Sequence, residues 1–492
     1  MRRMIYFVIL IAFACVGCGD AQDEFVGEPM IRYVGKCTDL TVTPGWQRVR
    51  LDWKNNVDPS IEKIKITWSD ESTSRDTLID GNLETCVIEH LGNSTYSFAV
   101  SAVDADNNIS MVEEEYGRPF TDEHELVGGF SRVVSKFFPR KKDNKLILFF
   151  SDWQEGLSEV TLSYYKGDKK EILPLTEEEV SKRFMTLENV NLEREVTVLR
   201  EGKIEGCMDL VPFPKYVLDM SERTFNNDFF KRLRVVHNLE VVTDEFIKNC
   251  EMLAFDYDLT SLEDVLYFPN LKKLQLGGGR YNINPMYASR LDDEEASEYA
   301  LRLLKESGVE IERYAQHYFF ENSDFLTEKG RPDIDKLNVR YLKTTDWTIK
   351  YFCSEENNTA YDAKAINLLD DNSKTVWQPL ISKTAPRTHE LIIDMGGEQL
   401  LDGFKIVQDV GSGFNMFYLP SLIKVSLSMD NQEWDAAMFF EENQLGASPS
   451  EITILRTDGS KKARYIKLSL SDMAGFNDYG IILADVIPFV NN

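Results

Sequence analysis

The chain has 492 residues, of which 43% are hydrophobic and 11% aromatic. At about 150 residues per domain, it is long enough for roughly three to four packed domains. Its net charge is -27, and so acidic a surface repels phosphate backbones and anionic lipid head groups, which excludes nucleic acid and basic-patch membrane docking. None of its five His and seven Cys has the spacing of a zinc site.

The N-terminus has the pattern of a targeting segment. Two arginines precede an apolar run over residues 4–14, which is too short to span a bilayer as a mature helix. Cys15 and Cys18 follow this run. Residues 1–17 are therefore predicted to be a signal peptide that is removed from the mature protein, and residues 18–35 a tether.

The end of this segment, with Gly17 directly before Cys18, resembles a bacterial lipobox, in which the cysteine is acylated. The resemblance implies lipidation at Cys18, with Cys15 as the second candidate and an ordinary secretory signal as the alternative. Residues 20–24 are rich in acid, which resembles the export signal of Bacteroidetes surface lipoproteins. The implied location is the bacterial outer membrane, surface-exposed, with the lipid anchor as the only membrane contact.

Five further cysteines lie beyond the signal segment, at positions 37, 86, 207, 250 and 353. Export makes disulfides possible, and Cys37 and Cys86 share one predicted domain, so a bond between them is an open possibility. An odd number leaves at least one thiol free, so the chain is not a disulfide scaffold.

Residues 36–121 are predicted to be an all-β domain. Strands such as 61–68 and 96–104 alternate apolar and polar residues between turns rich in Pro, Gly, Asn and Asp, which is typical of half-buried sheets. The early Trp53 and the strand Tyr96-Ser-Phe-Ala-Val-Ser-Ala-Val resemble a fibronectin type III module.

A weak repeat follows this domain at a spacing of about 100 residues. The Asp-Trp pair at 52–53 recurs at 152–153, and residues 64–70 recur as 160–168. We therefore predict a second fibronectin-like sandwich over residues 125–213. Tandem modules of this kind usually act as spacers.

Residues 222–320 alternate short strands with helix-like pieces. The stretch Phe268-Pro-Asn-Leu-Lys-Lys-Leu-Gln-Leu resembles the strand unit of a leucine-rich repeat, and residues 296–306 are amphipathic. We predict a small α/β unit that borrows burial from its neighbours, followed by a linker over residues 321–342. An unmarked enzyme is considered only in this unit, since the chain has no GxSxG elbow, phosphate loop or barrel pattern.

Residues 343–492 carry five sequence landmarks in a fixed order. These are Ala365 to Trp377, His389 to Gly396, Pro420 to Trp434, Ala463 to Leu468, and Leu483 to Val486. Together they resemble the discoidin, or coagulation factor type C, domain, whose fold is shared with carbohydrate-binding module family 32. The resemblance implies an eight-stranded jelly-roll sandwich. The predicted fold class is therefore mainly β and multidomain, with fibronectin-like sandwiches, a small leucine-rich-repeat-like α/β unit and this C-terminal jelly roll.

The first landmark crowds oxygen donors into one turn. Asp370, Asp371 and Asn372 stand side by side, and Thr375 adds a hydroxyl, while Ca²⁺ takes about six to eight oxygen ligands. In the family this loop and an acidic residue of the last strand share a structural Ca²⁺, which by position implies Asp370, Asn372, Thr375 and Asp485 as ligands. Asp371 replaces the usual glycine in a turn that favours positive φ. An Asx-turn without metal is the alternative.

Ligand binding in this family uses loops at one rim of the sandwich, and a sugar site needs an aromatic face beside polar side chains. The candidates lie in three loops and are Arg387, Phe414, Asn415, Phe417, Tyr418, Phe476, Asn477 and Tyr479. Trp377 and Trp434 are interpreted as core residues, because their strand pattern points inward. The basic residue that many sugar binders of the family carry in the 408–419 loop is absent.

The resemblances therefore imply a non-catalytic, lipid-anchored surface protein that binds a glycan or polysaccharide through its C-terminal domain. Two alternatives remain open. One is an adhesion or assembly module whose partner is a protein, since discoidin domains also bind proteins. The other is a glycan-active enzyme that sequence patterns do not mark.

Overall fold

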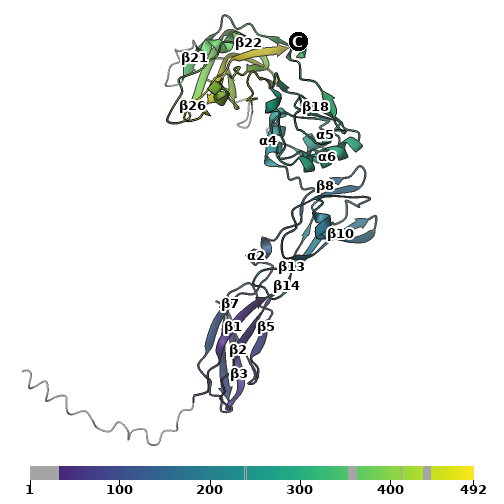
Figure 1. Cartoon of the computed structure of the whole chain (residues 1–492), viewed down its shortest axis with the longest axis vertical. Helices are drawn as coiled ribbons and strands as arrows, with labels where there is room; N and C mark the ends of the chain where they lie inside the picture. The colour runs from purple at the N-terminus through teal and green to yellow at the C-terminus, as the bar shows by residue number, and fades with distance from the viewer. Residues whose placement is uncertain (1–32, 238, 240, 353–362, 412, 436–444) are drawn as a thin grey trace, which may run out of the picture.

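The computed structural model describes residues 33–237, 239, 241–352, 363–411, 413–435 and 445–492. The predicted signal peptide and Cys18 lie outside these residues. The described part is mainly β, which confirms the predicted fold class, and its modules follow one another along a curved rod (Figure 1). Within the described ranges, no helix is both long enough and apolar enough to span a bilayer.

The first module is a sandwich of two antiparallel sheets. One sheet contains β1 (Thr38–Gly45), β2 (Arg48–Lys54) and β5 (Thr85–Glu89), and the other has the order β4 (Ser74–Asp80), β3 (Ile61–Ser69), β6 (Tyr96–Asp104), β7 (Glu113–Gly117). In β3, Ile64 and Ile66 are fully buried and alternate with lysines, as a strand with one core face requires. Cys37 and Cys86 are both free thiols, so the disulfide left open above is not formed. The likeness to fibronectin type III stays a prediction.

The second module is also a sandwich, preceded by the short helix α2 (Glu125–Gly128). Its sheets have the orders β12 (Phe184–Leu187), β9 (Lys145–Phe150), β8 (Val134–Arg140) and β11 (Lys169–Pro174), β10 (Leu157–Lys166), β13 (Thr197–Lys203), β14 (Leu210–Val217), with α3 (Glu177–Val180) between strands. Pro212 and Pro214 lie inside β14, which runs past residue 213, the predicted end of this sandwich. β14 is an edge strand, where a residue without N–H breaks no ladder on the open side.

The third module is a four-stranded parallel sheet, the predicted α/β unit. Its strands in order are β15 (Met252–Phe255), β16 (Lys273–Leu276), β18 (Glu310–Tyr314) and β19 (Thr327–Lys329), with α4 (Asn227–Val236), α5 (Asp244–Asn249), η1 (Glu263–Tyr267), η2 (Pro285–Tyr287) and α6 (Glu294–Glu306) in the connections. The Asp293 side chain accepts a 3.0 Å hydrogen bond from Ala296 N at the start of α6, and Gly308 follows its end with a φ of 85°, as N- and C-terminal caps do.

Residues 321–342 are not the linker that the sequence suggested. β19 completes the parallel sheet, η3 (Ile334–Lys336) follows it, and β20 (Val339–Tyr341) pairs with the last strand of the C-terminal module. Phe325 is buried in the core of the α/β unit. The segment therefore belongs to the two modules that it connects.

The α/β unit shares its core with the second sandwich. Phe138 and Phe149, from β8 and β9, pack in the same apolar cluster as Phe229 of α4, Leu253 of β15 and Tyr267 of η1. Ring centroids of Phe138 and Tyr267 are 4.6 Å apart. Burial of this kind supplies apolar contact that so small a sheet lacks by itself, which is the borrowed burial that we expected.

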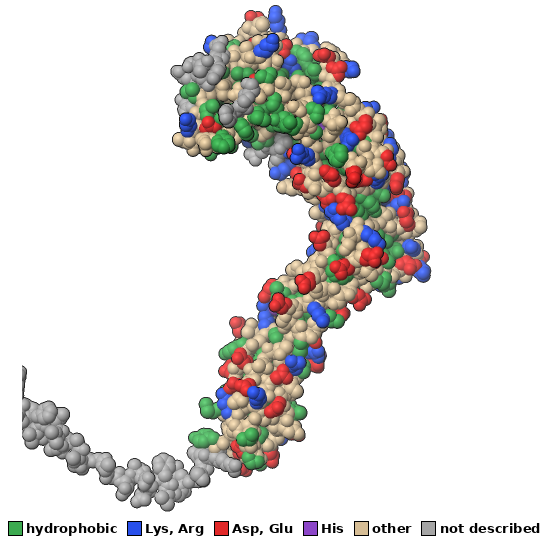
Figure 2. Space-filling model, in the orientation of Figure 1, with side chains coloured by type: hydrophobic (Ala, Val, Ile, Leu, Met, Phe, Trp, Pro, Cys, Tyr) green, Lys and Arg blue, Asp and Glu red, His purple; other side chains and the backbone are tan. Residues whose placement is uncertain are grey.

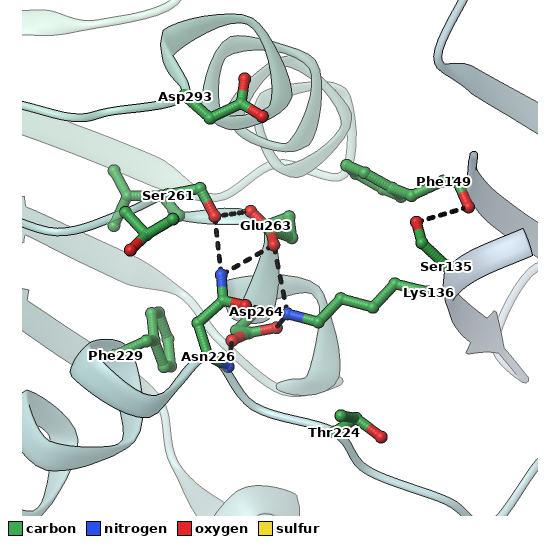
Figure 3. Close-up of polar contacts among 12 residues, drawn as sticks. Ser135, Lys136, Phe149, Thr224, Asn226, Phe229, Ser261, Glu263, Asp264 and Asp293 are labelled. Atoms are coloured by element: carbon green, nitrogen blue, oxygen red, sulfur yellow. Dashed lines mark hydrogen bonds and ion pairs between the residues drawn. The ribbon is translucent and has the colours of Figure 1, made fainter. Parts of the chain in front are cut away.

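A buried polar cluster sits beside this shared core (Figure 3). The Lys136 ammonium, on β8, donates to Asp264 Oδ1 at 2.6 Å, Asn226 Oδ1 at 2.8 Å and Glu263 Oε1 at 3.1 Å. The backbone N–H of Asn226 donates to Asp264 Oδ2 at 2.6 Å. One cation faces two carboxylates here, and burial raises the pKa of Asp264 to about 6, against the opposing effect of Lys136.

The C-terminal module is built around two long antiparallel strands, β22 (Thr388–Val407) and β24 (Ile452–Ser471). The first half of β22 pairs with β21 (Thr348–Phe352), and its second half pairs with β27 (Asp485–Asn491), while β23 (Lys424–Ser428) lies on β24. Trp377, Leu391, Phe404 and Ile466 are fully buried in its core. The shorter elements are η4 (Ala365–Leu369), η5 (Gly413–Tyr418), β25 (Met473–Ala474) and β26 (Tyr479–Gly480).

The α/β unit is joined to this module by a strand and an ion pair. β17 (Arg280–Tyr281) leaves the α/β unit and pairs with β24. Arg280 donates to Glu451 through Nε at 2.6 Å and Nη2 at 2.9 Å, and both side chains are buried. Because a two-pronged guanidinium–carboxylate contact fixes both distance and orientation, it sets how the C-terminal module is held.

Replacing Glu451 by alanine leaves the Arg280 guanidinium buried without its carboxylate. We expect the Glu451→Ala variant to lose about 3–5 kcal/mol of unfolding free energy, measured by denaturant titration. Arg464→Ala, which breaks the half-buried pair with Asp394 at the surface, is the matched control and is expected to change stability by about 1 kcal/mol or less. Equal losses in the two variants would contradict the assigned role of the buried pair.

Asp264 gives the junction in Figure 3 a pH dependence. Its folded-state pKa is raised, so its contribution to stability is complete below about pH 4 and is lost as pH rises through about 6. We expect the unfolding free energy to fall by about 1–3 kcal/mol between pH 4.5 and 7.5 from this group, and Asp264→Asn to flatten that part of the profile. An unchanged profile in Asp264→Asn would show that the carboxyl is already ionised across this range.

Candidate functional site

The predicted calcium loop follows η4 and meets the start of β27. The backbone N–H of Asn372 lies 3.0 Å from Asp370 Oδ1 and 3.2 Å from Asp485 Oδ1. The Thr375 hydroxyl donates to Asp370 Oδ2 at 2.7 Å and lies 2.8 Å from the Asn372 carbonyl. The fold therefore brings all four predicted ligands together across a sequence separation of more than one hundred residues. Asp371 has a φ of 52°, the left-handed backbone expected where the family has glycine.

This loop crowds negative charge. Asp485 is buried, and burial raises its pKa to about 7, with further raising by the charges of Asp370 and Asp371. Lys405 opposes that shift, and its ammonium lies 2.7 Å from Asp371 Oδ1. Repulsion among carboxylates is relieved by a bound cation.

The donor set suits a hard cation in kind, since it consists of carboxylate, amide, carbonyl and hydroxyl oxygens. Across the residues that the structure describes, no group of three or more His, Cys, Asp or Glu side chains is placed to hold a metal. A calcium ion here would therefore depend on the neutral oxygens of Asn372 and Thr375 as well as on the two carboxylates.

The three predicted rim loops are tied into one surface. Ser382 and Tyr479 exchange two backbone hydrogen bonds, of 2.8 and 2.7 Å, which joins the 378–388 loop to β26. The Tyr418 hydroxyl donates to Asp478 Oδ1 at 2.6 Å, which joins η5 to the β25–β26 hairpin. Loops braced in this way hold exposed side chains at fixed positions.

Tyr418, predicted to contact ligand, is instead the buried anchor of the rim. It is 6% exposed and packs with Leu419 and Ile482 in a small apolar cluster. Its ring lies so close to Gly475 that a Cβ there would be 2.7 Å from it. A tyrosine uses its hydroxyl in this way when the ring is core and one end reaches a polar partner.

Arg387 is also held inward. Its Nε donates to Asp472 Oδ2 at 2.8 Å, and His389 Nε2 lies 2.8 Å from the other oxygen of the same carboxylate. His389 and Asp472 are buried. The Arg387 charge is therefore used to stabilise a buried acid, which limits what it can offer to a ligand.

Among the predicted residues whose side chains the structure describes, Phe417 and Phe476 are the exposed aromatics of this rim, with exposed fractions of 45% and 81%. Asn477 is exposed as well, whereas Asn415 and Tyr479 are half-buried. The side chain of Phe414 lies outside the described residues. Sequence reasoning missed the exposed Leu380, Val410 and Met416, although all three stand in loops that the sequence had marked. Figure 2 shows hydrophobic side chains gathered on one side of this module.

The two tryptophans of the module differ. Trp377 is fully buried, and its ring stands edge-on to His389 at 5.6 Å, as the core interpretation requires. Trp434 is half-buried, with the Lys467 ammonium 4.8 Å from its ring centroid. The cation covers one face of that ring, so Trp434 is not a fully buried core residue.

The α/β unit was the one place considered for an enzyme, and ligands of open α/β sheets bind at the carboxyl ends of the strands. Here β16 ends at three glycines, and Gly277 has a φ of 78° with the His317 ring directly against it. The Asp256 carboxylate accepts a 2.8 Å hydrogen bond from Gly279 N. Arg280 then turns to Glu451 of the C-terminal module. The carboxyl end of β16 therefore leads directly into the contact with the neighbouring module.

Two family models match parts of the chain. The F5/8 type C domain matches residues 352–484, and the DUF4998 family, described as a domain of unknown function, matches residues 15–197. No curated protein matches the chain.

Several solved structures are similar to the C-terminal part. One is the module CpGH89CBM32-5 from Clostridium perfringens, in complex with GalNAc-β-1,3-galactose, at 17% identity over 31% of this chain and 100% of that one, with a TM-score of 0.26. Another is the C-terminal domain of a chitobiase from Bacteroides fragilis, at 20% identity over 31% and 100%, with a TM-score of 0.25. A third is the family 32 module of Clostridium perfringens NanJ in complex with galactose, at 18% identity over 31% and 99%, with a TM-score of 0.24. The family model and the jelly-roll architecture together identify residues 352–484 as an F5/8 type C domain.

Proposed function

We propose that this protein is a non-catalytic, lipid-anchored cell-surface protein that binds a glycan through the rim of its F5/8 type C domain. The observation that carries the proposal is the exposure of Phe417 and Phe476 on loops braced by the Tyr418–Asp478 hydrogen bond. An aromatic ring held open to solvent offers a flat apolar face for the C–H side of a sugar ring. Asn477 is exposed next to Phe476 and supplies donors and acceptors for hydroxyls.

The non-catalytic part of the proposal is supported by the α/β unit. Its strand ends, where an α/β enzyme would bind substrate, carry the Arg280–Glu451 contact to the neighbouring module. The outer-membrane location and the anchor at Cys18 are supported by the signal pattern at the N-terminus. The described modules follow one another along the rod (Figure 1), which supports a role as a spacer.

The proposal is tested by screening the purified protein against a panel of polysaccharides in affinity gels. Against a polysaccharide that retards the parent, the Phe417→Ala and Phe476→Ala variants are each expected to lose about tenfold in affinity, since a stacked aromatic contributes about 1 kcal/mol or more. Phe319→Ala removes a phenylalanine that is 65% exposed in the α/β unit and is the matched control, with no loss expected.

Two results would contradict glycan binding at the rim. Unchanged affinity of both rim variants, with normal folding, would place the binding site elsewhere. A folded parent that no polysaccharide retards would favour the protein-adhesion alternative, for which the exposed Leu380 and Met416 provide additional apolar contact area.

We further propose that the loop of Asp370, Asn372, Thr375 and Asp485 holds a structural Ca²⁺. The convergence of the four residues, with Asn372 contributing its backbone N–H, and the charge crowding at Asp485 support it. When bound, the ion supplies positive charge that neutralises the two carboxylates. The chain's own residues orient the oxygens: the Asn372 N–H places Asp370 and Asp485, and the Thr375 hydroxyl fixes Asp370.

Calcium added to chelator-treated protein is expected to raise the melting transition of the C-terminal module by about 5 °C, since a ligand at 100 times its Kd adds about 2.7 kcal/mol. Asp485→Asn is expected to abolish the rise, while Asp394→Asn, at the half-buried pair with Arg464, keeps it. Scanning calorimetry with and without calcium measures both. A transition that calcium does not move in the parent would refute the metal site.

A further inference from the structure

One face of the parallel sheet in the α/β unit is open to solvent. Leu253, Leu274 and Ile311 point to the side that packs with the helices in the shared core. On the opposite side, Met252 and Glu310 are exposed and Lys273 between them is half-buried. Parallel sheets are normally covered on both faces, so a face left open calls for its own explanation.

A carboxylate organises the centre of this face. Glu312 Oε2 accepts hydrogen bonds from Gln275 Nε2 at 2.9 Å and from the Tyr314 hydroxyl at 3.0 Å. Its Oε1 lies 2.9 Å from the Lys273 ammonium and 3.2 Å from that of Lys329. Burial raises the pKa of Glu312, but these donors outweigh burial and lower it to about 2, so the carboxylate is ionised at neutral pH.

The contacts preorganise groups that themselves reach solvent. Gln275, Tyr314, Lys273 and Lys329 are half-buried or exposed, whereas Glu312 beneath them is 4% exposed. Each ammonium carries three protons, and the Gln275 amide has an acceptor oxygen besides its donors. Polar side chains whose rotamers are already fixed lose less entropy when they bind a partner.

The chemistry of the face selects the kind of partner. Its two lysines are balanced by Glu310 and Glu312, so it attracts neither anions nor cations, although the chain as a whole is strongly acidic. Its apolar side chains are few and lie at opposite ends, whereas protein interfaces are built around an apolar centre. Fixed donors and acceptors on a surface whose charges balance suit a ligand rich in hydroxyls.

An aromatic ring completes the surface. Tyr314 ends β18 beside Gly278, where a Cβ would lie only 3.4 Å from the ring. Because the neighbour is glycine, one edge of the ring stays clear. A half-exposed tyrosine next to ordered hydrogen-bonding groups is a combination that sugar sites use.

We propose that the open sheet face, defined by Lys273, Gln275, Glu312, Tyr314, Thr327 and Lys329, is a second carbohydrate-binding surface, and that its ligand is an uncharged polysaccharide. The face lies in a different module from the rim loops and is argued from its own contacts, so it does not depend on binding at the rim.

The test uses affinity gels of the full chain with galactomannan, xyloglucan and soluble starch as neutral probes, and polygalacturonate and chondroitin sulfate as anionic probes. Gln275→Ala combined with Tyr314→Ala is expected to lose about fivefold or more in affinity for at least one neutral probe. The rim double variant Phe417→Ala/Phe476→Ala is expected to keep residual binding of that probe. Tyr116→Ala, at a tyrosine 65% exposed in the first sandwich, is the matched aromatic control.

A second variant guards against loss of folding. Ala254→Arg adds a long side chain beside Gln275 without removing any donor to Glu312, and is expected to weaken neutral probes in the same way. The inference is overturned if both face variants bind every probe like the parent. In that case, loss of binding in the rim variant would still support glycan binding at the rim. It is equally overturned if the face variants affect only anionic probes. A parent that binds no probe overturns both proposals.

Discussion

The buried ion pair between Arg280 and Glu451 is the contact on which the placement of the C-terminal domain depends. Both charges are buried, so removing either partner leaves the other as an uncompensated buried charge, which destabilises the interface. Arg280 follows three glycines at the end of β16, and Glu451 stands immediately before β24. The pair therefore ties the end of a parallel strand directly to β24, one of the two long antiparallel strands of the F5/8 type C domain.

The same kind of contact recurs at the other junctions. Lys136 joins the second sandwich to Asp264 of the α/β unit, and Asp209 accepts hydrogen bonds from Arg48 and from Trp46 N of the first sandwich. In each case a carboxylate meets its donors where two modules touch. Directional contacts fix orientation in a way that apolar packing alone does not, so the rod in Figure 1 carries its terminal domain at a set angle.

The sequence predicted the structure correctly where the pattern depends on neighbouring residues alone. Two of the five landmarks of residues 343–492, His389 to Gly396 and Ala463 to Leu468, lie within single strands. Asp371 occupies the positive-φ position that its place in the turn predicted. The local pattern could not tell which of Phe417 and Tyr418 is buried, because the two residues are adjacent and both aromatic. Which of them is buried is decided by Asp478, sixty positions away. The local pattern also missed β19 and β20. Strands of three residues are too short to show a hydrophobic period, and these two are stabilised by pairing with other strands.

Two buried carboxylates at the α/β unit have opposite structural effects. Glu451 and Glu312 are both buried carboxylates with charged donors. Glu451 is matched by the single guanidinium of Arg280, and the contact closes an interface. Glu312 instead gathers four donors that each extend toward solvent, which fixes an open surface rather than sealing one. The end of β16 is occupied by the contact with the C-terminal domain. The polar groups of the sheet face, by contrast, remain available to a ligand.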